Sequence, residues 1–333
     1  MNKIKIAIAG AGRIGQIHAE NLVTRVKEAR VVAISDIDEK RAKDLALRCG
    51  RISWYTDFYE MLEENDLDAV LICTSTNVHK DMIIAAAKKS KHIFCEKPVA
   101  LTLEETDEAL TAVDKAGVFM QVGFMRRFDP AIFSAKKEIE KGLIGEPLFF
   151  KAVSRDPEGP PIEYVKVSGG LFVDSSIHDF DLARWFMKSE VERVYAEGRV
   201  LIYPEYKEFG DVDVAFTTLV FKNGGLGNIE NSRRSGYGYD TRIEIVGSKG
   251  TLQIGYLRNR RFFVLNKSGV SYDVVPSSQE RFSEAFVREI QHFVDCIIEN
   301  KIPLITEIDG KKALEIALAA TKSCKEGRPV SLN

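Results

Sequence analysis

Three glycines near the N-terminus have the spacing of a phosphate-binding loop. Gly10, Gly12 and Gly15 form a G-x-G-x-x-G pattern that directly follows a short apolar run and opens a helical one. In a strand, loop and helix of this kind, the glycines permit a tight turn, a close approach of the backbone to a pyrophosphate, and packing of the helix on the sheet. The pattern therefore predicts a dinucleotide site that includes Arg13 and Ile14. The alternative is a glycine-rich turn that binds no ligand.

An acidic residue after the second predicted strand indicates which dinucleotide binds. Asp36 follows the apolar run from Val31 to Ile34, about 20 residues beyond the glycines, where an acid hydrogen-bonds the adenosine ribose. A carboxylate there repels the 2′-phosphate of NADP, so the sequence favours NAD. Arg41, five residues further on, could meet a 2′-phosphate. It is equally compatible with an exposed helix residue in an acidic neighbourhood.

Polar residues also follow the third predicted strand, which runs from Ala69 to Cys73. Open α/β sheets bind ligands at the carboxyl ends of their strands. We therefore expect Thr74, Ser75, Asn77 and His79 to line the nicotinamide half of the cofactor site. The alternative is a polar loop that caps the helix beginning at His79.

A lysine lies at the same edge, after the fourth predicted strand. Glu96 and Lys97 precede Pro98 directly after the apolar run from His92 to Cys95. Lys97 is placed to hold a substrate hydroxyl and to stabilise a developing alkoxide, and Glu96 is placed to contact the cofactor. A surface charge at a strand end explains Lys97 equally well.

The second half of the chain contains one more group with proton chemistry. If the stretch around His178 is helical, Asp174, His178 and Asp181 share one face of the helix. A carboxylate beside an imidazole orients the ring and favours its protonated form, so that His178 can accept a hydroxyl proton. A hydrogen-bonded core histidine is the plainer alternative. A metal site of one histidine and two carboxylates is also possible, but we expect no metal because a nicotinamide hydride acceptor makes a Lewis acid unnecessary.

The elements that must position these residues fall into two groups. Residues 1–123 alternate short apolar runs with helical patterns, which predicts an α/β Rossmann domain with a parallel sheet. Residues 124–333 contain consecutive extended segments separated by turn signals, which predicts an α+β domain with a large, mostly antiparallel open sheet. Two C-terminal helices, Ser283–Asn300 and Asp309–Lys325, are expected to pack back towards the first domain.

The composition limits the possible partners and the compartment. The chain has 333 residues, of which 45% are hydrophobic and 29% charged, enough for two domains with substantial cores. A net charge of −2 gives no field that would attract nucleic acid or anionic lipid. Five scattered cysteines argue against disulfides and thiolate zinc sites, and they fit a reducing cytoplasm. No stretch approaches the ~20 apolar residues of a membrane span, so we expect a soluble, non-exported protein.

Several stretches spread over nearly the whole chain together resemble one family. They are GAGRIG, SDID, CTSTNVH, CEKPVA, FMRRFDP, GGLFVDSSIHDFDLARW, SEAFVREIQHF and DGKKALEIALAATKSCKEGRPV. The sequence resembles the glucose-fructose oxidoreductase / inositol dehydrogenase / rhizopine-catabolism family, and most of all its inositol-oxidising members. The resemblance implies an NAD-dependent enzyme that oxidises one ring hydroxyl of a cyclic polyol, foremost myo-inositol, to the 2-keto product.

The resemblance also assigns roles to single residues. It implies that Lys97, Asp174 and His178 form the catalytic group, and that Arg127, Tyr237 and Tyr239 line the polyol pocket. It further implies that the C-terminal sheet pairs with another subunit, giving a homodimer or homotetramer. The segment from Arg155 to Val167, with its three prolines, departs from the family pattern.

Three other functions remain open on the sequence alone, the third being an unrelated metallohydrolase, which insensitivity to EDTA would exclude. An NADP-dependent sugar or ketose reductase of the same family would be supported by Arg41. A nucleotide-sensing protein would use the Rossmann fold without turnover. Lys97 and the pair of Asp174 and His178 argue against such a sensor, because binding alone needs no proton relay.

Overall fold

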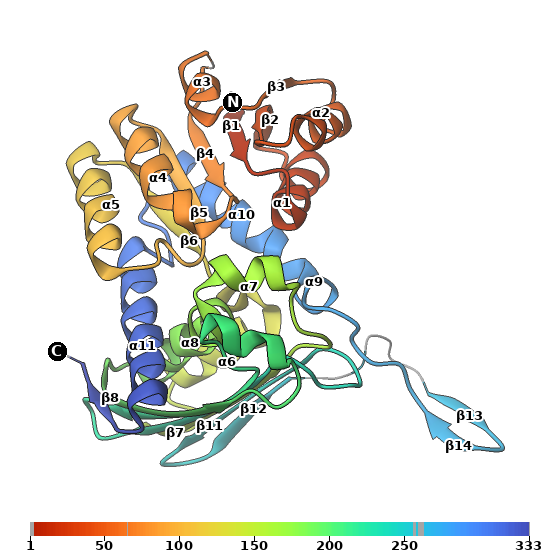
Figure 1. Ribbon diagram of the computed structural model, residues 1–333, viewed down its shortest axis with the longest axis vertical. Coiled ribbons are helices and arrows are strands. Elements are labelled where there is room, and N and C mark those ends of the chain that lie inside the picture. The colour runs from red at the N-terminus through yellow and green to blue at the C-terminus, as the bar shows by residue number, and fades with distance from the viewer. Residues whose placement is uncertain (1–2, 65, 256–257, 259–262, 333) are drawn as a thin grey trace. The chain divides into compact units, whose positions relative to one another are not determined.

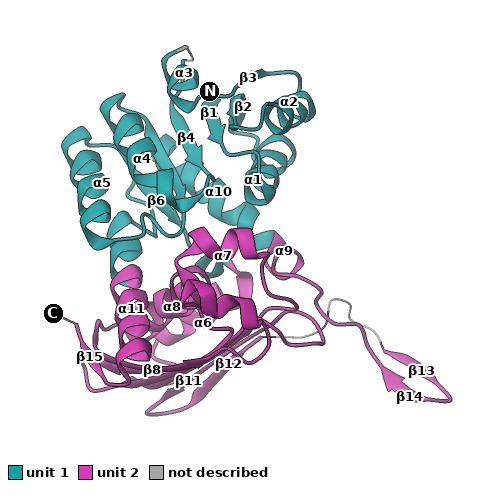
Figure 2. Cartoon of the chain, viewed as in Figure 1, with its two compact units in different colours: residues 1–128, 284–312 teal, residues 129–283, 313–333 magenta. Residues whose placement is uncertain are grey.

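The computed structural model describes residues 3–64, 66–255, 258 and 263–332. The chain forms two compact units (Figure 2). The first consists of residues 1–128 and 284–312, and the second of residues 129–283 and 313–333. Each unit is therefore built from two separate stretches of chain.

The first unit contains a six-stranded sheet in which all neighbouring strands are parallel (Figure 1). The strand order is β3-β2-β1-β4-β5-β6, which confirms the predicted Rossmann sheet. The order reverses direction between β1 and β4, the point at which such sheets bind ligands. The strands are β1 (Ile4–Ala9), β2 (Ala29–Ser35), β3 (Ser53–Tyr55), β4 (Ala69–Ile72), β5 (His92–Glu96) and β6 (Met120–Gly123).

Helices of the first unit come from both of its stretches of chain. Those from the N-terminal stretch are α1 (Arg13–Thr24), α2 (Glu39–Arg48), α3 (Phe58–Glu64), η1 (Thr76–Val78), α4 (His79–Lys88), α5 (Leu103–Ala116) and η2 (Met125–Phe128). The later stretch adds nearly all of α10 (Ser283–Glu299) and the start of α11 (Glu307–Glu326).

The helix α10 belongs to the first unit because of its apolar face. Ile290, Phe293 and Val294 lie in the same buried cluster as Ile6 and Ile8 of β1. Apolar positions three and four residues apart lie on one side of a helix, so α10 presents a continuous stripe to this core. A segment near residue 290 thus completes a core that begins at residue 4.

The second unit contains a seven-stranded mixed sheet. Its order is β12-β11-β7-β10-β9-β8-β15, and every neighbouring pair is antiparallel except β10 and β7. The predicted, mostly antiparallel sheet is confirmed. The strands are β7 (Pro147–Arg155), β8 (Val191–Arg199), β9 (Val214–Phe221), β10 (Leu226–Ser232), β11 (Asp240–Gly247), β12 (Thr251–Ile254) and β15 (Val330–Ser331), with a separate hairpin of β13 (Val264–Asn266) and β14 (Gly269–Ser271).

One face of this sheet is covered and the other is open. Along β9, Ala215, Thr217 and Leu219 are buried whereas Phe216 between them is 51% exposed. The buried side includes the stacked rings of Phe150 on β7 and Phe186 on α8. The remaining helices of the unit are α6 (Pro130–Glu140), α7 (Ile162–Ser168), η3 (Phe172–Ser176), α8 (Ile177–Met187), η4 (Pro204–Phe209), α9 (Ser278–Arg281) and the end of α11.

Among the described residues, no helix combines the length and the apolar character that a membrane span requires.

Candidate active site

Two of the three N-terminal glycines are required by the fold itself. Gly10 has φ of +95°, and a Cβ there would lie 2.5 Å from the carbonyl oxygen of Cys73. A Cβ on Gly15 would lie 1.9 Å from the carbonyl oxygen of Gly10. Gly12 differs, because a Cβ there would meet no described atom within 4 Å. Gly12 therefore opens onto space in front of the N-terminus of α1, where backbone N–H groups lack helical partners.

Asp36 links the end of β2 to this loop. Its Oδ2 accepts a hydrogen bond from the backbone N–H of Ala11 at 2.7 Å, and its Oδ1 accepts one from that of Asp38 at 2.9 Å. The predicted ribose-binding acid thus lies against the glycine loop. Arg41 lies on α2, and its Nε is 3.2 Å from Oδ2 of Asp38, the residue that caps the same helix.

The buried His79 connects two of the predicted ligand-binding loops. Its Nδ1 lies 2.8 Å from the carbonyl oxygen of Pro98, and its Nε2 lies 3.2 Å from that of Thr74. Burial lowers the pKa of His79, and a neutral imidazole donates from only one nitrogen. His79 therefore positions the two loops from the interior, whereas Ser75 and Asn77 are exposed.

Glu96 and Lys97 lie at the end of β5, at the edge where the sequence analysis placed them. Glu96 is the last residue of β5, and its Oε1 is 3.0 Å from Nε2 of His18 on α1. Lys97 follows as a half-buried residue, joined to Pro98 by a cis peptide bond.

Arg127 lies in η2 of the first unit and is 3% exposed. Its Nη2 is 2.9 Å from Oδ1 of Asp309 in α11, which balances the charge of the guanidinium. Sequence reasoning did not identify Asp309, because its partner lies 182 residues away.

In the second unit, the predicted proton-handling residues lie on a helix that begins with a π-helical turn. The turn η3 contains Asp174, and α8 contains His178, which is 7% exposed. The stretch is thus helical, which was the condition for placing Asp174 and His178 on one face. π-Helical turns are rare in proteins, and many of those that exist lie at functional sites.

Both oxygens of Asp174 are engaged. Oδ2 pairs with Nη1 of Arg233 at 2.8 Å, and Oδ1 accepts a hydrogen bond from the hydroxyl of Tyr164 at 2.8 Å. Arg233 is 3% exposed. Burial by itself would lower the pKa of Arg233, but the charges of Asp174 and Asp156 raise it above its ordinary value. This buried cation compensates the negative charge of Asp174.

The segment with three prolines, residues 155–167, contributes to these contacts. It supplies Tyr164 to Asp174, and it supplies Asp156, whose Oδ2 is 3.7 Å from Nη1 of Arg233. Arg233 follows β10 directly, and nothing in its local sequence indicated that it pairs with Asp174.

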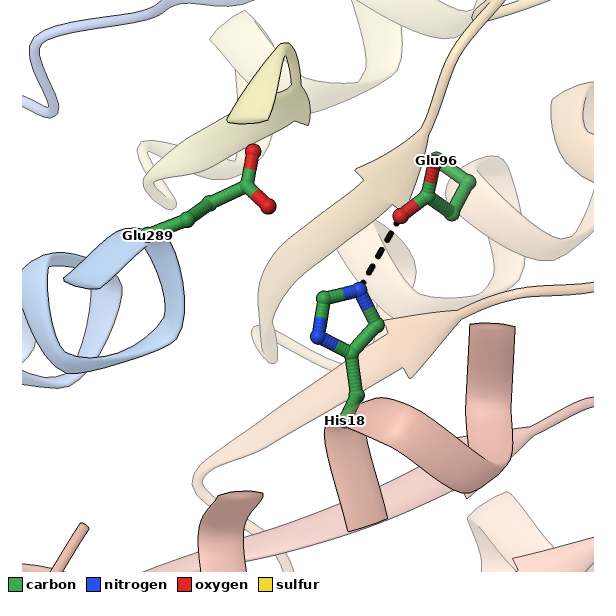
Figure 3. A group of neighbouring side chains, drawn as sticks. All are labelled: His18, Glu96 and Glu289. Carbon is green, nitrogen blue, oxygen red and sulfur yellow. Dashed lines mark hydrogen bonds and ion pairs between the residues drawn. The ribbon is translucent and has the colours of Figure 1, made fainter. Parts of the chain in front are cut away.

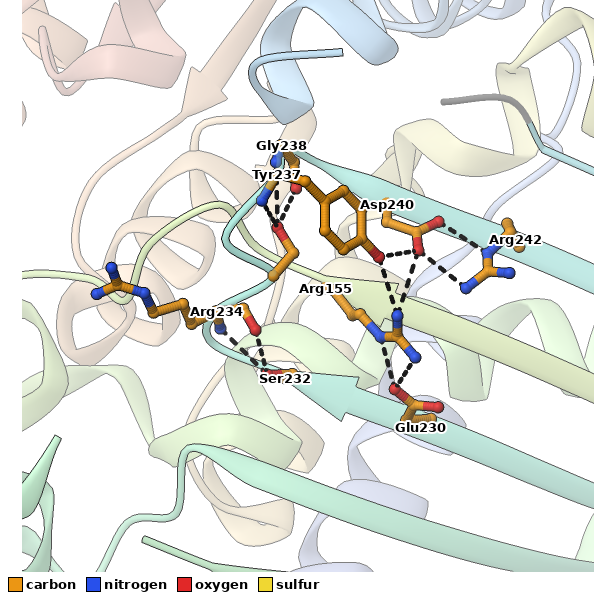
Figure 4. A network of polar contacts seen from close by, with 9 residues as sticks. Arg155, Glu230, Ser232, Arg234, Tyr237, Gly238, Asp240 and Arg242 are labelled. Atoms are coloured by element: carbon orange, nitrogen blue, oxygen red, sulfur yellow. Dashed lines mark hydrogen bonds and ion pairs between the residues drawn. The ribbon is translucent and has the colours of Figure 1, made fainter. Parts of the chain in front are cut away.

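The two tyrosines assigned to the polyol pocket have different surroundings. Tyr237 is 40% exposed; its hydroxyl donates to Oδ2 of Asp240 at 2.6 Å and accepts from Nη1 of Arg155 at 2.9 Å (Figure 4). Tyr239 is 5% exposed, and its ring packs edge-on against Phe282.

Comparison with known proteins identifies similar chains over the full length. Residues 4–124 match the profile described as "Oxidoreductase family, NAD-binding Rossmann fold", and residues 136–332 match "Oxidoreductase family, C-terminal alpha/beta domain". The chain is 45% identical to scyllo-inositol 2-dehydrogenase (NAD(+)) of Bacillus subtilis, covering 100% of this chain and 97% of the relative. It is 42% identical to myo-inositol 2-dehydrogenase of Thermotoga maritima, covering 99% and 98%.

Solved structures agree with these matches. The crystal structure of scyllo-inositol dehydrogenase from Lactobacillus casei with bound cofactor NAD(H) and scyllo-inositol superposes with a TM-score of 0.94 at 31% identity, covering 99% of both chains.

The different surroundings of the glycines lead to a prediction. Gly15→Ala should destabilise the fold by more than about 3 kcal/mol, because its Cβ would overlap a backbone oxygen. Gly12→Ala should leave the thermal midpoint nearly unchanged and weaken NAD⁺ binding about tenfold or more, because the methyl group occupies the approach to the helix N-terminus. Thermal unfolding and fluorescence titration measure the two effects. Wild-type NAD⁺ affinity in Gly12→Ala would contradict the assignment.

Proposed function

The chain belongs to the glucose-fructose oxidoreductase / inositol dehydrogenase / rhizopine-catabolism family, and from that membership we propose that it oxidises a ring hydroxyl of an inositol with NAD⁺. The observation that carries the proposal is similarity over the full length of both units to relatives named as inositol 2-dehydrogenases. Of the inositols, myo-inositol, giving the 2-keto product, and scyllo-inositol are the substrates to test first.

The residues of the first unit fit NAD. The open space at Gly12 admits a pyrophosphate to the N-terminus of α1, and Asp36 places a carboxylate beside the loop for the ribose hydroxyls. Bound NAD⁺ supplies the hydride acceptor. Thr74, Ser75, Asn77 and Glu96 would hold the nicotinamide half, with His79 as a positioning residue behind them.

Three residues are assigned to the chemistry of the substrate hydroxyl. Alcohol oxidation removes a hydride from carbon and a proton from oxygen. We assign the proton to His178 as general base, and we assign stabilisation of the developing alkoxide to Lys97. Asp174 would orient the imidazole. Tyr164 and Arg233 would hold Asp174 in place, because each binds one of its two carboxylate oxygens. Arg127, Tyr237 and Tyr239 stay predicted contacts of the polyol.

The two units would divide the work. The first, with its dinucleotide loop, would be the NAD-binding domain, and the second would bind substrate and form subunit contacts. Arg41, the feature that would support an NADP-dependent reductase, pairs with Asp38. We propose a cytoplasmic location on the strength of the scattered free cysteines.

The substrate is tested directly by a panel. Steady-state rates with myo-inositol, scyllo-inositol, hexoses and sugar ketones, each with the NAD and NADP couples, should show inositol oxidation with NAD⁺ as the best pair. A protein that binds NAD⁺ and turns over none of these compounds would support the sensor alternative.

The proposed mechanism predicts different kinetic effects for substitutions of His178, Asp174 and Lys97. His178→Ala should lower kcat by about 10²- to 10⁴-fold, the usual contribution of a general base, while NAD⁺ affinity stays nearly constant. The wild-type rate should rise from acid to alkaline pH as the base loses its proton, and that rise should be absent in His178→Ala.

Two further substitutions separate the roles of the neighbouring residues. Asp174→Asn should lower kcat less than His178→Ala does, and Lys97→Ala should change both kcat and the polyol KM. If His178→Ala kept the rate and the acid limb while Lys97→Ala lost both, Lys97 would be the base.

Coenzyme preference follows from Asp36. The wild type should have a higher kcat/KM with NAD⁺ than with NADP⁺, and Asp36→Ala should narrow the ratio by about tenfold or more because it removes the repulsion of the 2′-phosphate. Arg41→Ala is the control, and it should leave the ratio unchanged because Arg41 pairs with Asp38. Equal or better use of NADP⁺ by the wild type would overturn the preference.

We also propose that the open face of the second unit's sheet pairs with another copy of the chain. Tyr195, Phe216 and Leu226 are 38%, 51% and 47% exposed on the neighbouring strands β8, β9 and β10, and such a face is usually covered. Light scattering should report at least a dimer, and Phe216→Asp should reduce the mass. Leu47→Asp, on the exposed side of α2, is the control. A monomeric wild type at micromolar concentration would refute the proposal.

A further inference from the structure

Three ionisable side chains from distant parts of the sequence meet inside the first unit (Figure 3). His18 comes from α1, Glu96 from the end of β5, and Glu289 from α10. One nitrogen or carboxylate oxygen of each lies within 4.8 Å of the others. Nε2 of His18 and Oε1 of Glu96 are 3.0 Å apart, and the carboxyl group of Glu289 points towards this pair.

Glu289 has a second unusual property. Its side chain is 0% exposed, and neither carboxyl oxygen has a hydrogen-bond partner among the residues that the structure describes. Nδ1 of the equally buried His18 also lacks one within those residues. Buried polar atoms are almost always paired, and clustered exceptions mark places for an ion or a bound water.

The charges favour a cation over a water at this place. Apolar rings surround the imidazole, since Phe94 and Phe286 pack edge-on against His18. In such surroundings two carboxylates repel strongly, and a divalent cation would neutralise both.

The backbone leaves room for the carboxylate. Gly123 ends β6, the neighbour of β5, and a Cβ at this glycine would lie 3.0 Å from Oε2 and 3.1 Å from Oε1 of Glu96. Glycine here allows Glu96 to keep its position beside His18. The 3.0 Å separation of the His18 nitrogen and the Glu96 oxygen suits two ligands that each bind a metal at about 2.0–2.2 Å.

We propose that His18, Glu96 and Glu289 bind one divalent transition-metal cation. One imidazole and two carboxylates form a nitrogen and oxygen ligand set that suits Zn²⁺, Co²⁺ or Mn²⁺. The cation would be structural, since it would join α10 to α1 and β5 within the first unit. It would also fix the residue that precedes Lys97. The proposal does not depend on the identity of the polyol.

The test measures metal binding rather than activity. The full-length protein is stripped with chelator, saturated with NAD⁺ so that metal binding is compared in one liganded state, and titrated with Co²⁺. We expect about one Co²⁺ per chain, a visible d–d absorption band, displacement by Zn²⁺, and a thermal midpoint that rises with metal concentration. Mass spectrometry of metal content after gel filtration gives the stoichiometry.

Matched variants on the same helix locate the site. Glu289→Gln should weaken Co²⁺ binding by at least about 100-fold. This is the upper end of the loss in metal affinity seen when a residue that hydrogen-bonds a metal ligand is replaced. Glu299→Gln, an exposed residue of α10, should bind like the wild type. If Glu289→Gln does not fold, His18→Gln and the metal content of the wild type decide the question.

Three results would overturn the proposal. The first is wild-type protein that retains no stoichiometric metal and shows no metal-dependent midpoint, which would mean that the cluster holds only protons. The second is equal Co²⁺ affinity in Glu289→Gln and the wild type. The third is a thiolate charge-transfer band that persists in Glu289→Gln, which would place the metal at Cys296 and His292, whose Sγ and Nε2 are 3.4 Å apart.

Discussion

The close approach of α1 to the ends of β1 and β4 is the constraint on which the first unit depends. The approach is possible only because Gly10 and Gly15 lack side chains, since a Cβ on either would enter a backbone carbonyl. Two consequences follow from this contact. The N-terminus of α1 opens onto the space in front of Gly12, and Ala11 comes within hydrogen-bond distance of Asp36. The same placement of α1 brings His18, one turn further along the helix, to the carboxylate of Glu96.

In the second unit, the buried cation of Arg233 fixes the positions of several segments. Arg233 compensates Asp174 directly and Asp156 at a longer distance. Leaving a buried guanidinium without a carboxylate is strongly unfavourable, so the conformations of residues near 156, 174 and 233 are tied together. The π-helical turn that carries Asp174 is therefore held from the side by β10 as well as by its own helix.

Local patterns were enough to predict the fold and the glycine loop between β1 and α1. The glycine spacing, Asp36 and the alternation of strands and helices are all short-range features, and the structure contains the corresponding elements. Side-chain pairing was not predictable in the same way. Arg127 pairs with Asp309 and Arg233 with Asp174 across 182 and 59 residues, and a single sequence carries no signal that joins such positions. The exposure of neighbouring side chains was not predictable either, because the sequence pattern does not indicate which of Tyr237 and Tyr239 is buried.

The split composition of the first unit has a consequence for the order in which the protein is made. The ribosome completes residues 1–128 and then the whole second-unit stretch 129–283 before α10 leaves the exit tunnel. At about 5–20 residues per second, the nascent Rossmann sheet waits on the order of ten seconds without Ile290, Phe293 and Val294. During that interval the surface around Ile6 and Ile8 that α10 later covers is exposed to chaperones and to neighbouring nascent chains. A message truncated after the second-unit stretch would yield a cofactor unit with an uncovered core rather than an independent domain.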